Sequence, residues 1–188
     1  MNRREAIKRV GLLFGGVLYA PAVAGLLSGC RSGGEAAFTP RTLTPEQNDL
    51  VIHLTEMIIP ETDTPGAKAA RVNEFVDLIL TDWAPAEDRD RFLAGLADVE
   101  ARSQAAYQVA FLEATPEQQV ALLTQLEDEA LAAPAPPDAQ PFFLMLKQLT
   151  LLGYYTSEIG ATQELQWLAA PGRYDGCAPL EEVGRTWA

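Results

Sequence analysis

Residues 142–160 read FFLMLKQLTLLGYYTSEIG, and this stretch decides the fold. Its apolar side chains fall on nearly every side of a helix, a pattern typical of a helix surrounded by protein. Gly160 is the residue at which we expect this helix to end. Such a helix needs several neighbours to cover it, so the rest of the chain should supply them.

Other segments have the spacing of amphipathic helices, while strand patterns are scarce. Two begin with Thr-Pro-Glu-Gln, at Thr44 and Thr115, where the threonine caps the helix and the glutamine closes a capping box. Residues 69–83 and 87–114 each carry an apolar stripe, and the proline-rich residues 131–141 predict a loop. The sequence predicts an all-α domain over residues 43–188, an irregular bundle of about five helices with a long C-terminal docking tail.

The first 30 residues have the pattern of an export signal. Arg3 and Arg4 precede an uncharged stretch from Val10 to Gly29, which glycines and Pro21 make only weakly hydrophobic. Paired arginines before such a stretch resemble the twin-arginine (Tat) signal, which exports proteins already folded. The sequence therefore predicts Tat export to the periplasm.

Cys30 ends the sequence Leu27-Ser28-Gly29-Cys30, which is similar to the bacterial lipobox. In that motif the cysteine thiol receives a lipid and the cysteine becomes the new N-terminus, so we expect a membrane-anchored lipoprotein. Plain signal cleavage and an uncleaved anchor are the alternatives. Residues 31–42 are then expected to form a tether to the folded domain.

Charge is distributed unevenly along the chain. The net charge is −12, but residues 1–30 carry +3, so the remainder carries −15. A surface this acidic repels phosphate backbones, which argues against nucleic-acid binding. It suits either a basic partner surface or a solvated acidic face that keeps the protein soluble.

The polar side chains do not suggest an active site. His53 is the only histidine and is more readily interpreted as structural than as catalytic. No nucleotide-binding glycine motif, c-type haem motif or iron–sulfur cysteine set occurs, and residues 60–67 lack the calcium ligands of an EF-hand. We therefore expect no catalytic group, metal or cofactor in this chain.

Cys177 is the second of two cysteines. If Cys30 carries lipid, Cys177 has no partner within the chain, and an odd cysteine in an oxidising compartment suggests a disulfide to another protein. A buried thiol packed as a small apolar group is the alternative.

Three stretches resemble a known family: LTPEQNDLVIHLTEMIIPETDTPGAKAARVNEFVD (43–77), LKQLTLLGYYTSEIGA (146–161) and WLAAPGRYDGC (167–177). They are similar to gluconate 2-dehydrogenase subunit 3. The resemblance implies a non-catalytic small subunit of a large FAD-containing dehydrogenase of the glucose–methanol–choline (GMC) type, acting on sugars, sugar acids or polyols. It also implies that a multihaem cytochrome c joins some of these complexes, and that the small subunit supplies the Tat signal for a flavoprotein that lacks one.

The leading hypothesis is thus an accessory subunit that exports, assembles and tethers the flavoprotein. Its candidate partner-surface residues are Tyr154, Tyr155, Trp167, Tyr174 and Trp187, because large aromatic groups anchor interfaces. A stand-alone periplasmic lipoprotein, acting as a scaffold or ligand-binding module, is the alternative. An independent enzyme is the weakest reading, because the polar groups do not assemble a site.

Overall fold

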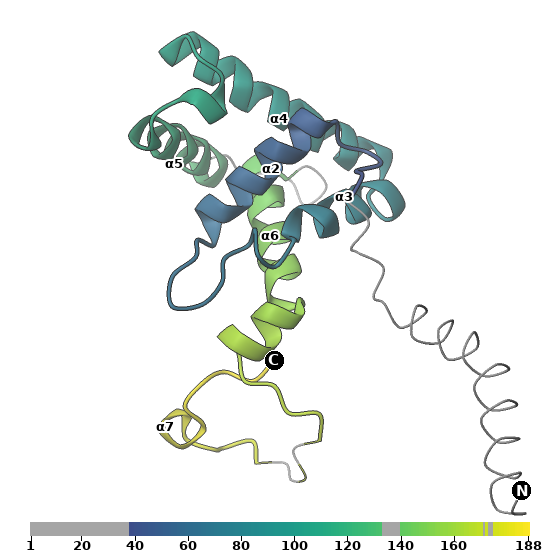
Figure 1. Cartoon of the computed structure of the whole chain (residues 1–188), viewed down its shortest axis with the longest axis vertical. Helices are drawn as coiled ribbons and strands as arrows, with labels where there is room; N and C mark the ends of the chain where they lie inside the picture. The colour runs from purple at the N-terminus through teal and green to yellow at the C-terminus, as the bar shows by residue number, and fades with distance from the viewer. Residues whose placement is uncertain (1–37, 133–139, 171, 173–174) are drawn as a thin grey trace, which may run out of the picture. The chain divides into compact units, whose positions relative to one another are not determined.

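The helix expected to organise the fold, α6 (Phe142–Tyr155), stands at the centre of the bundle (Figure 1). The computed structural model describes residues 38–132, 140–170, 172 and 175–188, and residues 39–188 form one unit. Four helices pack on α6: α2 (Pro45–Ile58), α3 (Val72–Asp82), α4 (Ala86–Tyr107) and α5 (Pro116–Ala132). The described residues contain helices and no strand, which confirms the all-α irregular bundle.

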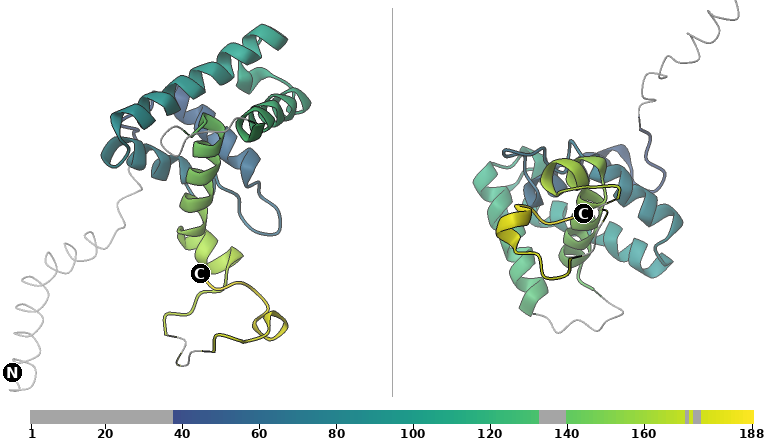
Figure 2. Two further views of the ribbon diagram at one scale, coloured as in Figure 1. Left: turned by 180° about the vertical axis from the view of Figure 1, so that it is seen from behind. Right: turned by 90° about the horizontal axis from the view of Figure 1, so that it is seen from below.

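The sequence predicted that neighbouring segments cover α6 on all sides, and that prediction is wrong. Phe143, Leu146 and Tyr154 lie in the core. The C-terminal half of the helix extends beyond its neighbours (Figures 1 and 2). There Leu151, Leu152 and Tyr155 are 39%, 49% and 40% exposed. The apolar side chains of α6 therefore form part of the core on one side of the helix and an accessible face on the other.

Both predicted capping boxes form. The Thr44 hydroxyl accepts the Gln47 N–H at 3.2 Å, and the Gln47 side chain accepts the Thr44 N–H at 3.0 Å. Thr115 and Gln118 exchange the same two bonds at the start of α5. These residues satisfy backbone donors that the first helical turn would otherwise leave unpaired.

The predicted helix over 87–114 is interrupted. α4 ends at Tyr107, Gln108 adopts a left-handed φ of 62°, and a short 3₁₀ helix, η1 (Phe111–Glu113), follows. Ser103 donates its hydroxyl to the Val109 carbonyl, and Glu100 accepts the Phe111 N–H. These bonds turn the chain back and bury Phe111 in the core. Tertiary contacts override the local helical pattern here.

The predicted loop over 131–141 is shorter at its start, because α5 continues to Ala132. Residues 133–139 lie outside the described residues. Pro141 forms the N-cap of α6, a position that suits proline because the helix does not need its missing N–H.

α6 ends at Tyr155, so the prediction of a stop at Gly160 is wrong. The Ser157 hydroxyl donates to the Tyr154 carbonyl at 2.6 Å and accepts the Gly160 N–H at 3.0 Å. A short π-helix, η2 (Gly160–Glu164), follows. A Cβ on residue 160 would lie 2.0 Å from the Tyr154 carbonyl oxygen, so glycine is required for this close approach and not for a helix stop.

Candidate partner interface

The loop between α2 and α3 is held by one glutamate. The Glu56 carboxylate accepts the Glu61 N–H at 2.9 Å and the Lys68 N–H at 2.7 Å. The Ala67 N–H also donates to the Ile59 carbonyl at 2.9 Å. Residues 60–67, which hold two prolines and one glycine, therefore form a loop fixed at both ends.

This loop bonds to the end of α6 and to η2. The Tyr154 hydroxyl donates to the Pro65 carbonyl at 2.7 Å, and the Thr64 hydroxyl donates to Glu164 at 2.6 Å. Burial raises the pKa of the Tyr154 phenol, which keeps it protonated as a donor. Two of the stretches that carry the family resemblance thus touch each other, a contact that sequence spacing alone does not reveal.

Tyr154 was predicted to lie at a partner surface, and that prediction is wrong. Its side chain is only 1% exposed and belongs to the core. Successive helical residues differ in direction by about 100°, so the next residue faces elsewhere. Tyr155 is accessible and contacts the Tyr154 ring edge-to-face, with ring centroids 5.3 Å apart.

Tyr155 belongs to an accessible surface that the sequence reading largely missed. We call it the α6 face; it is lined by Gln140, Leu144, Lys147, Gln148, Leu151, Leu152 and Tyr155. These residues border an open, shallow hollow of about 570 Å³. A surface with this many large apolar groups along one helix is typical of a protein-binding site.

The tail that follows η2 closes on itself. The Gln166 N–H donates to the Thr186 carbonyl at 2.9 Å, and the Ala188 N–H donates to the Gln166 carbonyl at 3.0 Å. Between these points lies a short helix, α7 (Leu180–Val183), seen at the C-terminal end of the chain in Figure 1. Trp167 and Trp187, both predicted interface residues, lie beside the closing bonds and are exposed.

Cys177 lies in this closed tail and is exposed, so the alternative of a buried thiol is wrong. Its N–H donates to the Asp175 carboxylate at 3.2 Å, which forms a local turn. The other predicted residues, Arg3, Arg4, Cys30 and Tyr174, lie outside the described residues.

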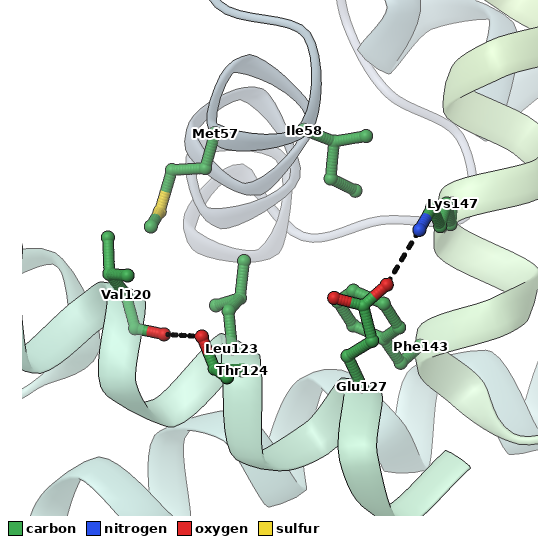
Figure 3. Close-up of a pocket in the computed structure, with 8 residues that line it drawn as sticks. All are labelled: Met57, Ile58, Val120, Leu123, Thr124, Glu127, Phe143 and Lys147. Atoms are coloured by element: carbon green, nitrogen blue, oxygen red, sulfur yellow. Dashed lines mark hydrogen bonds and ion pairs between the residues drawn. The ribbon is translucent and has the colours of Figure 1, made fainter. Parts of the chain in front are cut away.

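A second hollow, of about 250 Å³, lies between α2, α5 and α6 (Figure 3). Met57, Ile58 and Val120 line it with apolar groups. An ion pair joins Lys147 of α6 to Glu127 of α5 at 2.6 Å across one side. Because the pair ties the two helices together, we interpret this hollow as part of the helix packing.

His53 makes contacts between elements. Gln119 donates its amide to the Phe111 carbonyl at 2.8 Å, so its side-chain oxygen must accept a bond from His53 Nε2 at 2.9 Å. The imidazole also contacts the Phe111 ring edge-on, with centroids 6.1 Å apart. His53 thereby joins α2 to η1 and α5.

Two other kinds of site are absent from the part of the chain that the structure describes. No helix there is both long and apolar enough to span a membrane. Nor do three or more His, Cys, Asp or Glu side chains converge there as potential metal ligands.

Comparison with known families settles which family this is. A family model described as gluconate 2-dehydrogenase subunit 3 matches residues 45–172. The chain belongs to the gluconate 2-dehydrogenase subunit 3 family. The name describes one subunit of a dehydrogenase complex, and it confirms the resemblance found in the sequence. Among curated proteins and among solved structures, nothing matches.

The family match locates the shared part of the subunit 3 fold. It runs from the first turn of α2 into the tail, so it includes the loop held by Glu56 and the whole α6 face. Trp187 and Cys177 lie beyond it. The α6 face is therefore an accessible apolar surface within the part of the chain that the family model matches.

Proposed function

We propose that this protein is the non-catalytic accessory subunit of a periplasmic FAD-dependent dehydrogenase of the GMC type, acting on a sugar, sugar acid or polyol. FAD and the catalytic groups belong to the large subunit, and in some complexes a multihaem cytochrome c accepts the electrons. The accessory subunit docks the flavoprotein, supplies the Tat signal at Arg3 and Arg4, and tethers the complex through a lipid on Cys30.

The observation that carries this proposal is the accessible apolar face on the central helix of a subunit-family fold. Leu151, Leu152 and Tyr155 remain in water in the isolated chain, at a hydrophobic cost of about 25 cal/mol per Å². A docked partner removes that cost. The exposed Trp167 and Trp187 of the tail extend the proposed surface with anchor groups of the kind found at interface centres.

The Tat signal follows from the location of the cofactor. A flavoprotein that binds FAD in the cytoplasm must cross the membrane folded, and a docked accessory subunit provides one address for both chains. Docking must then precede export, so the α6 face has to form its contact in the cytoplasm.

Co-purification tests the docking surface. The chain is co-expressed with its proposed flavoprotein large subunit, and flavin absorbance is measured in the affinity-purified complex. Leu152→Glu places a charge in the α6 face and should weaken association at least tenfold, about 1.4 kcal/mol. Leu112→Glu is the matched control, because Leu112 is 43% exposed against 49% for Leu152 but lies on η1.

The two variants must first show unfolding curves like that of the parent protein, since both side chains are accessible. If Leu152→Glu retains as much flavoprotein as Leu112→Glu, the α6 face is not the docking surface.

A second experiment tests export. The double variant Arg3→Lys/Arg4→Lys keeps the charge of the signal and should hold both subunits in the cytoplasm. Flavoprotein that still reaches the periplasm would show that it has its own route.

A further inference from the structure

The segment that enters the folded domain is fastened to α3 by one buried carboxylate. Asp77 accepts backbone N–H groups from Arg41, Thr42 and Leu43, each at 2.9 Å. The Thr42 and Thr81 hydroxyls also bond at 2.7 Å. We call residues 39–43 the strap; its attachment fixes the point at which the N-terminal part of the chain meets the domain.

That point lies beside a prominent tryptophan. Arg41 of the strap pairs with Asp82 at 2.6 Å, and Asp82 is the last residue of α3. Trp83 follows at the C-cap and is 78% exposed, more than any other large apolar side chain in the described residues. It does not line the α6 face.

Two carboxylates close to Trp83 along the chain are paired, although the chain as a whole is acidic. Asp82 pairs with Arg41, and Asp88, which shares the first turn of α4 with Glu87, pairs with Arg91 at 2.7 Å. These two pairs reduce the repulsion between this corner of the domain and an anionic lipid surface.

The length of chain between the strap and Cys30 brings this corner close to the proposed lipid anchor. Nine residue steps separate Cys30 from Thr39, and a fully extended chain covers at most about 32 Å over that length. A group held this near a surface meets it at a high effective concentration, so even a weak contact forms.

We infer that Trp83 contacts the lipid bilayer, with its indole ring at the level of the headgroups. Tryptophan favours this zone because its ring is apolar while its N–H requires a polar partner. The contact would fix the rotation of the domain about its tether. This inference rests on the proposed lipid anchor at Cys30.

The test uses full-length lipidated protein in which Trp83 is the only tryptophan, with Trp167→Phe and Trp187→Phe. It is reconstituted with phosphatidylcholine vesicles, some of which carry brominated acyl chains. We expect the Trp83 emission to shift to shorter wavelength and to be quenched by the brominated lipid. The matched control keeps Trp167 alone, which is 59% exposed, and should show neither change.

Vesicle flotation distinguishes failure of the lipid anchor at Cys30 from failure of the Trp83 contact. Protein that floats with the vesicles while Trp83 emission stays unchanged retains the anchor and overturns the contact. Protein that does not float refutes the anchor and the contact with it. A Trp83 shift produced by the large subunit without vesicles would assign this corner to the protein partner and also overturn the inference.

Discussion

Removing the Asp77 carboxylate should loosen the strap and destabilise the whole domain. Asp77 is 1% exposed and Leu43, one of its donors, is 4% exposed. In Asp77→Ala the Leu43 N–H loses its acceptor at a site that water does not reach, which costs about 1–3 kcal/mol. The Arg41 and Thr42 N–H groups are only partly buried and can bind water instead. We therefore expect a loss of about 2–4 kcal/mol in the free energy of unfolding.

Urea unfolding, followed by helical circular dichroism, measures this loss. The midpoint should fall while the slope with denaturant stays the same, because the surface exposed on unfolding hardly changes. In a domain of this size the loss corresponds to a melting temperature lower by roughly 10 °C. Asp77→Asn keeps one acceptor oxygen for Thr42 and Leu43 and should lose about half as much.

Asp82→Ala is the matched control for Asp77→Ala. It removes the other α3 carboxylate that bonds to the strap. In the Arg41–Asp82 pair, however, the two side chains are 54% and 43% exposed. Exposed pairs contribute about 0–1 kcal/mol, so this variant should unfold almost like the parent. Equal losses for the two variants, or no loss for Asp77→Ala, would refute the role assigned to the buried carboxylate.

Two further predictions concern packing and the tail. Gly95→Ala should destabilise the domain by about 1–3 kcal/mol, because its Cβ would lie 2.1 Å from Phe142 Cγ and 2.4 Å from Phe142 Cβ, and rotation of the phenylalanine side chain does not move its Cβ. In Gly153→Ala the nearest contacts are longer, 2.7 Å to Phe75 Cδ1 and 3.3 Å to Val72 Cγ1, so this variant should cost less in the same urea titration. The reverse order would contradict this reasoning. Cys177 should form a disulfide with the large subunit, so non-reducing electrophoresis of the native complex should give one heavy band that a reductant splits. Two separate bands without reductant would rule the disulfide out.

The helices were largely predictable because their signals are local. Thr44 and Thr115 cap their helices through residues three positions away, so the sequence contains the whole motif. The break after Tyr107 was not predictable in this way. It depends on Glu100 reaching the Phe111 N–H and on Gln108 accepting a left-handed φ, neither of which a periodic pattern records.

The partner surface was harder to predict for a related reason. Because α6 is apolar all round, the sequence does not say which side the neighbouring helices cover. From the sequence, Tyr154 and Tyr155 are equally good candidates for a surface position. In the structure Tyr154 lies in the core and donates to the Pro65 carbonyl, whereas Tyr155 is accessible. The proposed roles of Arg3, Arg4 and Cys30 stay predictions from sequence motifs.

The exposed state of the α6 face is informative because the chain contains a segment long enough to cover it. The tail follows η2, the short element after α6, and holds Trp167, Leu168, Leu180 and Trp187, all exposed. In a self-contained domain, folding this segment over Leu151, Leu152 and Tyr155 would bury two apolar surfaces at once, at about 25 cal/mol per Å². Instead the two ends of the tail bond to each other at Gln166. The α6 face and the apolar side chains of the tail both remain accessible. The proposed complex accounts for this arrangement, because a docked partner can cover apolar surfaces that the isolated chain leaves in water.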